Sequence, residues 1–425
     1  MSKDIKLSGQ PVLCQFFSFI PNAIIEDAVA KCGSDRYYKT MTTKKQLACL
    51  LYGVITRTNS LQSLCKSLRF LENRLSYIGI EKIPPVSTLS DANIKRGSEV
   101  FGEIYSQLLT QYQSSLFRHD FNVPINGEVD PSLVKLLDAT TVTLFVDIFK
   151  AAGRPPLTGK QKGGIKVHSE MPLIGRVPDL IYITEASCND KVFLGQLKAA
   201  PGTIYVFDKG YISYFTFESW GKQGTFYVTR LKENATFKVV KSIVRSPDEY
   251  ATGGVIKDEV IECILKGQDK PLTARLVTYK DPLSGTILQF FSNMFDCDSS
   301  TIATLYKFRW EMEVLLKRIK GNFQLDYFYS DSPEGIKTQI WIVLIANLVF
   351  SVIHRQIKES EQFATLIAMA ANNLGSYICF ITFLKTYQKP LITPSEHRNY
   401  QVSLFMKSRW VFLITSENPL RMNKK

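Results

Sequence analysis

Three carboxylates stand at positions where an acidic side chain is costly without a partner. Asp138 lies in the apolar stretch LLDAT, Asp208 ends the apolar stretch of YVFDKGY, and Glu313 lies in YKFRWEMEVLLKRIKGN. Burial of a carboxylate is unfavourable unless it is paired or coordinates a cation. Carboxylate oxygens are the ligands that Mg²⁺ prefers, and Mg²⁺ keeps positions open for water and phosphate. If the three acids converge, we expect a metal site suited to phosphodiester chemistry.

Four polar residues share one face of the helix predicted around Glu313: Tyr306, Arg309, Glu313 and Lys320. Their spacings of 3, 4 and 7 residues bring them to the same side of an α-helix. A metal ligand would then be flanked by two cations and a phenol that can bind phosphate oxygens. Each charge taken singly fits an ordinary amphipathic helix better, so the combination carries the prediction.

Supporting candidates lie near the first acid. Lys166 and His168 alternate along a predicted strand and would share one face, either near Asp138 in contact with DNA or as a simple exposed strand face. The basic, Gly-rich loop 150–164 can follow phosphates or be a solvated hairpin loop. It is not a nucleotide-binding P-loop, because the GxxxxGK[ST] spacing is absent.

Composition narrows the class of partner. The 425 residues carry 52 Lys and Arg against 39 Asp and Glu, a net charge of +13 that suits a polyanion, with nucleic acid the first candidate. Eight scattered cysteines without a Cys-x-x-Cys pair, and only four histidines, favour reduced thiols in a cytosolic protein over zinc sites or disulfides. An acidic-substrate enzyme or an anionic membrane surface stays open at this point.

The most apolar stretch, residues 340–353, is too short for a membrane span of ~20 residues and predicts a buried core helix. The N-terminus has no sustained apolar region typical of a secretory signal. We therefore expect a cytoplasmic protein without a membrane partner.

Residues 1–117 are predicted to be helical throughout, with Asn59 or Ser60 and Ser87 or Ser90 as N-caps. Short helices with Lys95 and Arg96 at the end of one of them suit a helix-turn-helix-like DNA-binding module. A plain helical bundle with a solvated basic face fits the pattern equally well. Residues 118–130, with Pro and Gly, read as a linker.

From residue 131 the pattern becomes mixed α/β. The predicted order is three strands, a helix, a strand, a helix and a strand, which indicates a sheet with an antiparallel and a parallel part. About 233–297 reads as four strands, a β-rich insertion, and helices return from Thr301. The chain ends in a basic, poorly patterned tail, 386–425.

A family resemblance rests on these residues. The spacing from Tyr306 to Lys320 matches the Y-x2-R-x3-E-x6-K motif of a class of bacterial insertion-sequence DDE transposases. DKGY from Asp208, FYVTRLK from Phe226, LLDATTV and GGIKVHSEM resemble the two Asp regions of that class. STLSDANIKR resembles the N-terminal helical domain of one subgroup. The blocks occur in the family's order over most of the chain.

The resemblance implies an RNase H-like catalytic domain over 131–385, preceded by an all-α domain. It implies that Asp138, Asp208 and Glu313 hold two Mg²⁺ ions, for which Mn²⁺ can substitute. Residues implied or proposed as contacts to transposon-end DNA are Tyr306, Arg309 and Lys320, and with weaker support Tyr211, Arg230, Lys232, Lys166 and His168.

The function implied is cutting and joining of the ends of the element's own DNA, by a homodimer on paired double-stranded ends. Two alternatives stay open: an RNase H-fold nuclease without strand transfer, and a non-catalytic DNA-binding protein descended from a transposase. One feature departs from better-known relatives, which use a tryptophan of the insertion to hold a flipped base of a DNA hairpin. The insertion here has no Trp, and its aromatics Tyr279, Phe290 and Phe291 either substitute or form strand core.

Overall fold

The computed structural model describes residues 9–116, 125, 129–143, 164–243, 254–263, 271–358 and 361–386. The predicted loop 150–164, except for its last residue, almost all of the linker 118–130 and the tail from 387 onward lie outside these residues. The N-terminal region is helical, as expected. Its helices are α1 (Val12–Phe17), α2 (Asn22–Cys32), α3 (Thr43–Thr56), α4 (Leu61–Arg69), α5 (Val86–Lys95) and α6 (Glu99–Leu116).

The starts of these helices test the predicted caps. The hydroxyl oxygen of Ser60 accepts a hydrogen bond from the backbone N–H of Ser63, so Ser60 caps α4 as predicted. The predicted Ser cap of α5 is wrong. That helix begins at Val86 directly after Pro85, whose fixed φ leads into a helix without a side-chain cap, and Ser87 falls inside the first turn.

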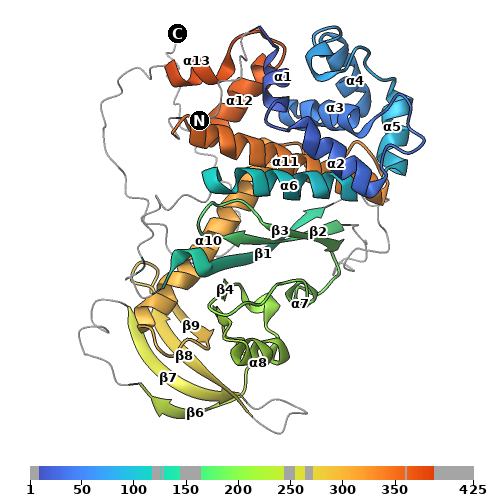
Figure 1. Cartoon of the computed structure of the whole chain (residues 1–425). Helices are drawn as coiled ribbons and strands as arrows, with labels where there is room; N and C mark the ends of the chain where they lie inside the picture. The colour runs from blue at the N-terminus through green and yellow to red at the C-terminus, as the bar shows by residue number, and fades with distance from the viewer. Residues whose placement is uncertain are drawn as a thin grey trace, which may run out of the picture.

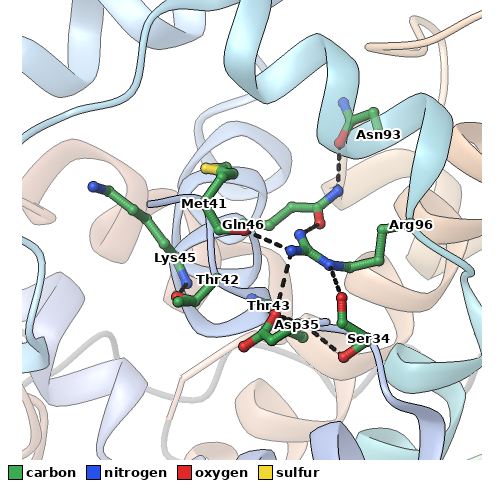
Figure 2. A network of polar contacts seen from close by, with 9 residues as sticks. All are labelled: Ser34, Asp35, Met41, Thr42, Thr43, Lys45, Gln46, Asn93 and Arg96. Carbon is green, nitrogen blue, oxygen red and sulfur yellow. Dashed lines mark hydrogen bonds and ion pairs between the residues drawn. The ribbon is translucent and has the colours of Figure 1, made fainter. Parts of the chain in front are cut away.

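Arg96 at the end of α5 lies in the interior and not on a basic face (Figure 2). Its guanidinium group donates hydrogen bonds to the side chains of Gln46 and Asp35 and to the backbone oxygens of Ser34 and Met41. A buried guanidinium group needs such partners to offset the loss of its hydration. Arg96 therefore joins α5 to the α2–α3 connection, and the expectation that it contributes to a DNA-binding surface is wrong.

The described strands after α6 form one nine-stranded mixed sheet, in the order β3-β2-β1-β4-β5-β9-β8-β7-β6. Strands β1 to β3 are antiparallel, whereas β4 runs parallel to β1 and β5 runs parallel to β4. This confirms the predicted mixture of the two pairings. The strands are β1 (Val134–Thr143), β2 (Gly164–Pro172), β3 (Leu180–Glu185), β4 (Ile204–Val206) and β5 (Phe226–Arg230).

The predicted insertion forms as four strands that extend this sheet. β9 pairs antiparallel with β5, so the insertion adds to the edge of the first five strands, and Figure 1 shows the added strands curving away at the lower end of the molecule. The four are β6 (Phe237–Ser242), β7 (Val255–Cys263), β8 (Leu272–Lys280) and β9 (Ile287–Ser292). Its residues Tyr279, Phe290 and Phe291 are buried, the first two in the core that includes α10 and Phe291 in the core on the other face of the sheet.

The two faces of the sheet have separate hydrophobic cores because side chains alternate along each strand. One core joins the sheet to α10 (Ser299–Asn322), to α11 (Pro333–Gln356) and to the N-terminal helices. The same core also includes residues of the last two described helices, α12 (Phe363–Asn373) and α13 (Phe380–Thr386). The other core lies under α7 (Lys191–Leu194) and α8 (Tyr214–Lys222). The N-terminal helices thus share a core with the sheet.

Helix α11 contains the apolar stretch 340–353. Among the described residues it is the one helix with the length and hydropathy of a membrane span. Its most apolar 18-residue segment has a mean hydropathy of 1.9, and 83% of that segment is buried inside the protein. Figure 1 shows α11 lying between α6 and α3, two of the N-terminal helices that it contacts. The prediction of a buried core helix is confirmed. All eight cysteines lie in described parts of the chain and are free thiols, as expected.

Candidate active site

The three acids come from three elements that pack together. Asp138 lies in β1, where it pairs in register with Ser169 of β2. Asp208 follows the short strand β4, which runs parallel to β1, and precedes the 3-10 turn η3 (Lys209–Tyr211). Glu313 lies in the middle of α10, the helix that packs on β1, β4 and β5. Parallel pairing of β1 and β4 brings the first two acids to the same region of the sheet.

Side chains of α10 and β5 contact two of these acids, Asp208 and Glu313. The Arg309 guanidinium group lies 2.7 Å from a carboxylate oxygen of Glu313, one turn along the helix. The Tyr306 hydroxyl donates to Asp208 Oδ1 at 3.2 Å. The side chain of Arg230, at the end of β5, also donates to Asp208 Oδ1 at 3.0 Å. Tyr306 and Arg309 therefore converge on the acids as their spacing predicts.

The pKa of Asp138 records how close the other charges lie. Burial raises the pKa of this carboxyl, Arg309 and the N–H of Ala139 lower it, and Glu313 and Asp208 raise it again, with a net pKa of about 6. A carboxyl with a raised pKa beside two further acids is stabilised in its charged form by a nearby cation. Among the described residues Asp138 has no ion pair of its own, whereas Asp208 pairs with Arg230 and Glu313 pairs with Arg309.

Asp208 has the opposite balance. Burial raises the pKa of Asp208, but Arg230, the backbone N–H of Lys209 and Arg309 outweigh that effect and hold the pKa below its ordinary value. The carboxylate is therefore ionised at neutral pH and is 38% exposed. It is accessible to an incoming cation, at the expense of its bond to Arg230.

The donor set of these acids suits a divalent ion. Carboxylate oxygens from separate elements, one with a raised pKa, are the hard ligands of Mg²⁺ and Mn²⁺. Within the described part of the chain no three acidic, histidine or cysteine side chains meet closely enough to hold one ion as they stand. Arg230 and Arg309 occupy the carboxylates instead. Asp138, Asp208 and Glu313 fit a metal site in which those guanidinium groups give way.

Lys320 lies two turns beyond Glu313 on α10. Its ammonium group donates to the backbone oxygen of Thr141 in β1 at 2.9 Å, and burial lowers the pKa of the lysine. Lys232 follows β5 with a half-exposed side chain. Lys320 thus lies with α10 on the face of the sheet that carries the acids, and Arg230 lies at the end of β5 beside Asp208.

Three other candidates lie elsewhere. Lys166, His168 and Tyr211 are 5%, 0% and 2% exposed. Lys166 and His168 do share one face of β2, as expected, but their neighbours Ile165 and Val167 belong to the core under α10, so the two point to the opposite face. As the structure stands, no DNA can touch them. The sequence also gave no reason to single out Asp190, which binds Lys166 and precedes a helix of only four residues.

Comparison with known proteins identifies the family. The pattern described as the transposase DDE domain matches residues 130–348, half of the chain, and a domain of unknown function (DUF4372) matches residues 8–81. The chain belongs to the DDE transposase family. All three acids and the Tyr306 to Lys320 face of α10 lie inside the matched DDE domain. Divalent metal ions are generally used by this family, whose members act on DNA.

Named relatives agree with that assignment. A putative transposase, y4zB, of Sinorhizobium fredii is 28% identical over 64% of this chain and 72% of its own length. A probable transposase for insertion sequence element IS5377 of Geobacillus stearothermophilus is 22% identical over 61% of this chain and 64% of its own length. Among solved structures, a piggyBac transposase synaptic complex with hairpin DNA covers 88% of this chain and 81% of its own, at 11% identity and a TM-score of 0.42.

Proposed function

We propose that this DDE transposase cuts and joins the ends of its own insertion sequence through Asp138, Asp208 and Glu313, with two Mg²⁺ ions or Mn²⁺ in their place. The observation that carries this proposal is the set of contacts made by α10: Tyr306 donates to Asp208, Arg309 pairs with Glu313, and the charges of Arg309 and Glu313 act on the pKa of Asp138. When bound, such ions activate water or a DNA 3′-hydroxyl for in-line attack and stabilise the leaving oxygen.

The side chains around the acids would exchange partners as DNA and metal bind. Arg230 leaves Asp208 and Arg309 leaves Glu313, and each guanidinium group becomes free to donate two parallel hydrogen bonds to a phosphate. Tyr306 keeps its ring buried against Phe290 and offers its hydroxyl at the same place. The cations thus neutralise the acids in the free protein and bind the DNA backbone in the complex.

The remaining chain would supply DNA binding and assembly. We infer that the N-terminal helices hold double-stranded DNA through solvent-exposed cations such as Lys39, Lys66 and Arg69. Two copies on paired ends would place one catalytic unit, 131–385, at each end. Because Tyr279, Phe290 and Phe291 are buried and the insertion has no tryptophan, the proposal does not include a base-flipping wedge from β8 or β9.

The test uses the full chain and a plasmid that carries the DNA flanking its coding region. Wild-type protein with Mg²⁺ should cut at both flanks and join the released 3′ ends to target DNA. Asp138→Asn, Asp208→Asn and Glu313→Gln should each abolish cutting and retain binding of the ends in a gel-shift assay. Wild-type cutting by any of the three would remove that residue from the metal site. Cutting without joining by the wild type would show a nuclease instead.

A further inference from the structure

The C-terminal end of α10 is bound to the connection between α3 and α4, a contact that the chemistry proposed above does not use. Figure 1 shows α10 running from the added strands of the sheet up to α11 and the N-terminal helices. The helix ends at Asn322, and the backbone N–H of Gln324 donates to the backbone oxygen of Val54 in α3 at 3.1 Å. We call this contact, between residues 53–60 and 321–329, the α10 anchor.

The side chain of Gln324 lies at the centre of the α10 anchor and is only 2% exposed. Its amide nitrogen donates to the backbone oxygens of Arg57 and Thr58 at 3.2 and 2.9 Å and to the side-chain oxygen of Asn59 at 3.2 Å. The backbone oxygen of Gln324 accepts from Gln339 of α11 at 2.9 Å. A buried amide needs such partners to offset the loss of its hydration, and this one finds its acceptors in the N-terminal region.

Arg57 contributes to the α10 anchor from a strained backbone conformation. It follows the last residue of α3 with a φ of 54°, the left-handed conformation that glycine adopts without strain. Its guanidinium group donates to the backbone oxygen of Gly321 at 2.7 Å and to Asp326 Oδ2 at 2.9 Å. Because glycine would end α3 with less strain, the bonds made by the side chain explain why an arginine stands here.

Gly53 allows the two segments to approach closely. It lies inside α3, where glycine is less favourable than alanine. A Cβ atom at Gly53 would lie 2.8 Å from the hydroxyl oxygen of Tyr329, and that hydroxyl donates to the backbone oxygen of Thr58 at 3.0 Å. A helical glycine, a left-handed arginine and a buried glutamine thus meet at one contact. Local choices that are unfavourable by themselves concentrate at functional positions.

The α10 anchor lies between the proposed metal site and a basic helix. Glu313 is about 14 Å from Asn322 along the helix axis, at ~1.5 Å per residue, so a shift of this end of α10 is carried to Glu313. On the other side of the anchor, α4 begins at Leu61 and exposes Lys66 and Arg69 in its last turn. The anchor therefore joins the helix that carries an acid to a helix proposed to hold DNA.

We propose that the α10 anchor positions the active site: Gln324 and Arg57 are positioning residues that fix where Glu313 lies relative to the DNA held by α4. The inference rests on the proposed function in taking Glu313 as a metal ligand and α4 as a DNA contact. It gives residues 8–81, matched by a domain of unknown function, a part in catalysis besides DNA binding. A displacement of ~1 Å caused by a change far from the reacting atoms can lower a rate about 10²-fold.

The first experiment measures single-turnover cleavage of end DNA by the full chain with Mg²⁺, at DNA concentrations that saturate the protein. Gln324→Met keeps the size of the side chain and removes its amide. It should lower the rate constant about tenfold or more, because Glu313 is no longer held in place. It should also cut at phosphodiesters beside the wild-type position. The Kd for end DNA in a gel-shift assay should stay unchanged, since no cation is removed.

Gln15→Met is the matched control. Gln15 is also 2% exposed, and its amide nitrogen donates to the backbone oxygens of Gln10 and Ile378 at 2.8 and 2.6 Å, so it joins α1 to the segment before α13. Both variants lose a buried amide and should have a lower Tm. Lower stability reduces the active fraction, and hence the amplitude of the reaction, without changing its rate constant. Equal rate constants and cut positions in the two variants would overturn the inference.

Arg57→Gly tests the α10 anchor without a loss of stability. Glycine adopts the left-handed conformation without strain, so the Tm should stay close to that of the wild type while the rate constant falls. Lys358→Gly is the control, because Lys358 follows α11 with a φ of 55°. A wild-type rate constant in Arg57→Gly would contradict the role of Arg57, as would a weaker Kd for DNA with an unchanged rate constant. If Gln324→Met does not fold, Arg57→Gly decides.

Hydrogen exchange without DNA gives a readout independent of cleavage. In Gln324→Met the backbone amides of residues 313–323 should exchange faster than in the wild type, and those of β7 and β8 should not. Unchanged exchange in 313–323 would show that the α10 anchor does not hold the helix and would sink the inference.

Glu313→Gln separates the inference from the proposed function. If Glu313→Gln does not cut, while Gln324→Met and Arg57→Gly cut at the wild-type rate and position, the inference is wrong and the proposed function stands. Cutting by Glu313→Gln at the wild-type rate would instead refute the metal role of Glu313, and the inference would fall with it.

Discussion

Two regions of the molecule hold arginine–carboxylate pairs that differ in how completely they are sealed. In the insertion, Arg275 of β8 binds Asp258 of β7 through two parallel hydrogen bonds of 2.8 and 2.6 Å, and both side chains are 0% exposed. Arg275 also donates to the backbone oxygens of Met294 and Cys297, in the connection that leads into α10. The Arg275 guanidinium group is therefore bonded both to the carboxylate of its partner and to the backbone.

The pairs at the candidate active site are open by comparison. Arg230 and Asp208 are 29% and 38% exposed, and Arg309 and Glu313 are 16% and 28% exposed. Solvent that reaches a pair lowers the cost of separating it. An arginine–carboxylate pair that is buried away from solvent therefore stabilises the fold, whereas a partly exposed pair of the same kind is able to exchange partners.

Loss of the active-site acid should have the largest effect on activity and almost none on folding. Glu313→Gln should lower DNA cleavage by more than ~10³-fold, because a neutral amide is a poor metal ligand. Its free energy of unfolding should stay within about 1 kcal/mol of the wild type, since the side chain is partly exposed. Cleavage assays and urea denaturation measure the two effects. A strongly destabilised Glu313→Gln would remove the contrast with the insertion.

Breaking the sealed pair should do the reverse. Arg275→Met should cost about 3–5 kcal/mol of unfolding free energy, because it leaves the Asp258 charge buried without its main partner. Asp258→Leu added to Arg275→Met should recover a large part of that loss. Urea denaturation of the single and double variants gives the coupling. A loss below about 1 kcal/mol in Arg275→Met would show that the buried pair is not the structural one.

Asp138 should show a smaller, pH-dependent effect on stability. Its pKa of about 6 lies above that of an unfolded Asp, so the folded protein binds the proton more tightly and loses stability as the pH rises from about 4 to 6. Without metal, Asp138→Asn should be more stable than the wild type by about 1–2 kcal/mol at neutral pH, discounted for partial exposure. The difference should vanish near pH 4. A constant difference in Tm from about pH 4 to 8 would contradict this.

The smallest expected effect concerns a single phosphate contact. Lys320→Ala should weaken binding of end DNA and reduce the salt slope of log K by about one unit, as removal of one phosphate contact does. Lys222→Ala serves as control, because Lys222 lies on α8 on the other face of the sheet and pairs with Glu218. Gel-shift titrations at several salt concentrations compare the variants. Equal slopes would exclude a phosphate contact by Lys320.

Much of this architecture was predictable because it depends on local pattern. The order of strands and helices from 131 onward, the β-rich insertion and the buried helix around 340–353 follow from hydrophobic periodicity, and the structure has each of them. The spacing of Tyr306, Arg309 and Glu313 likewise fixes one helix face before any fold is known. The predicted cap of α5 failed because the helix begins at Val86, directly after Pro85 and one residue before Ser87.

The amino-acid sequence alone determines which residues lie on the same face of a strand or of a helix. That relation depends only on the backbone periods of 2 and 3.6 residues. Tertiary structure decided which face meets which. It buried Arg96, Lys166, His168 and Tyr211, and it brought Asp190 against the turn after Asp208. Those outcomes depend on how elements distant in the sequence pack together. The local sequence around a polar residue is the same whether that packing exposes or buries its side chain, so the sequence alone does not decide between the two.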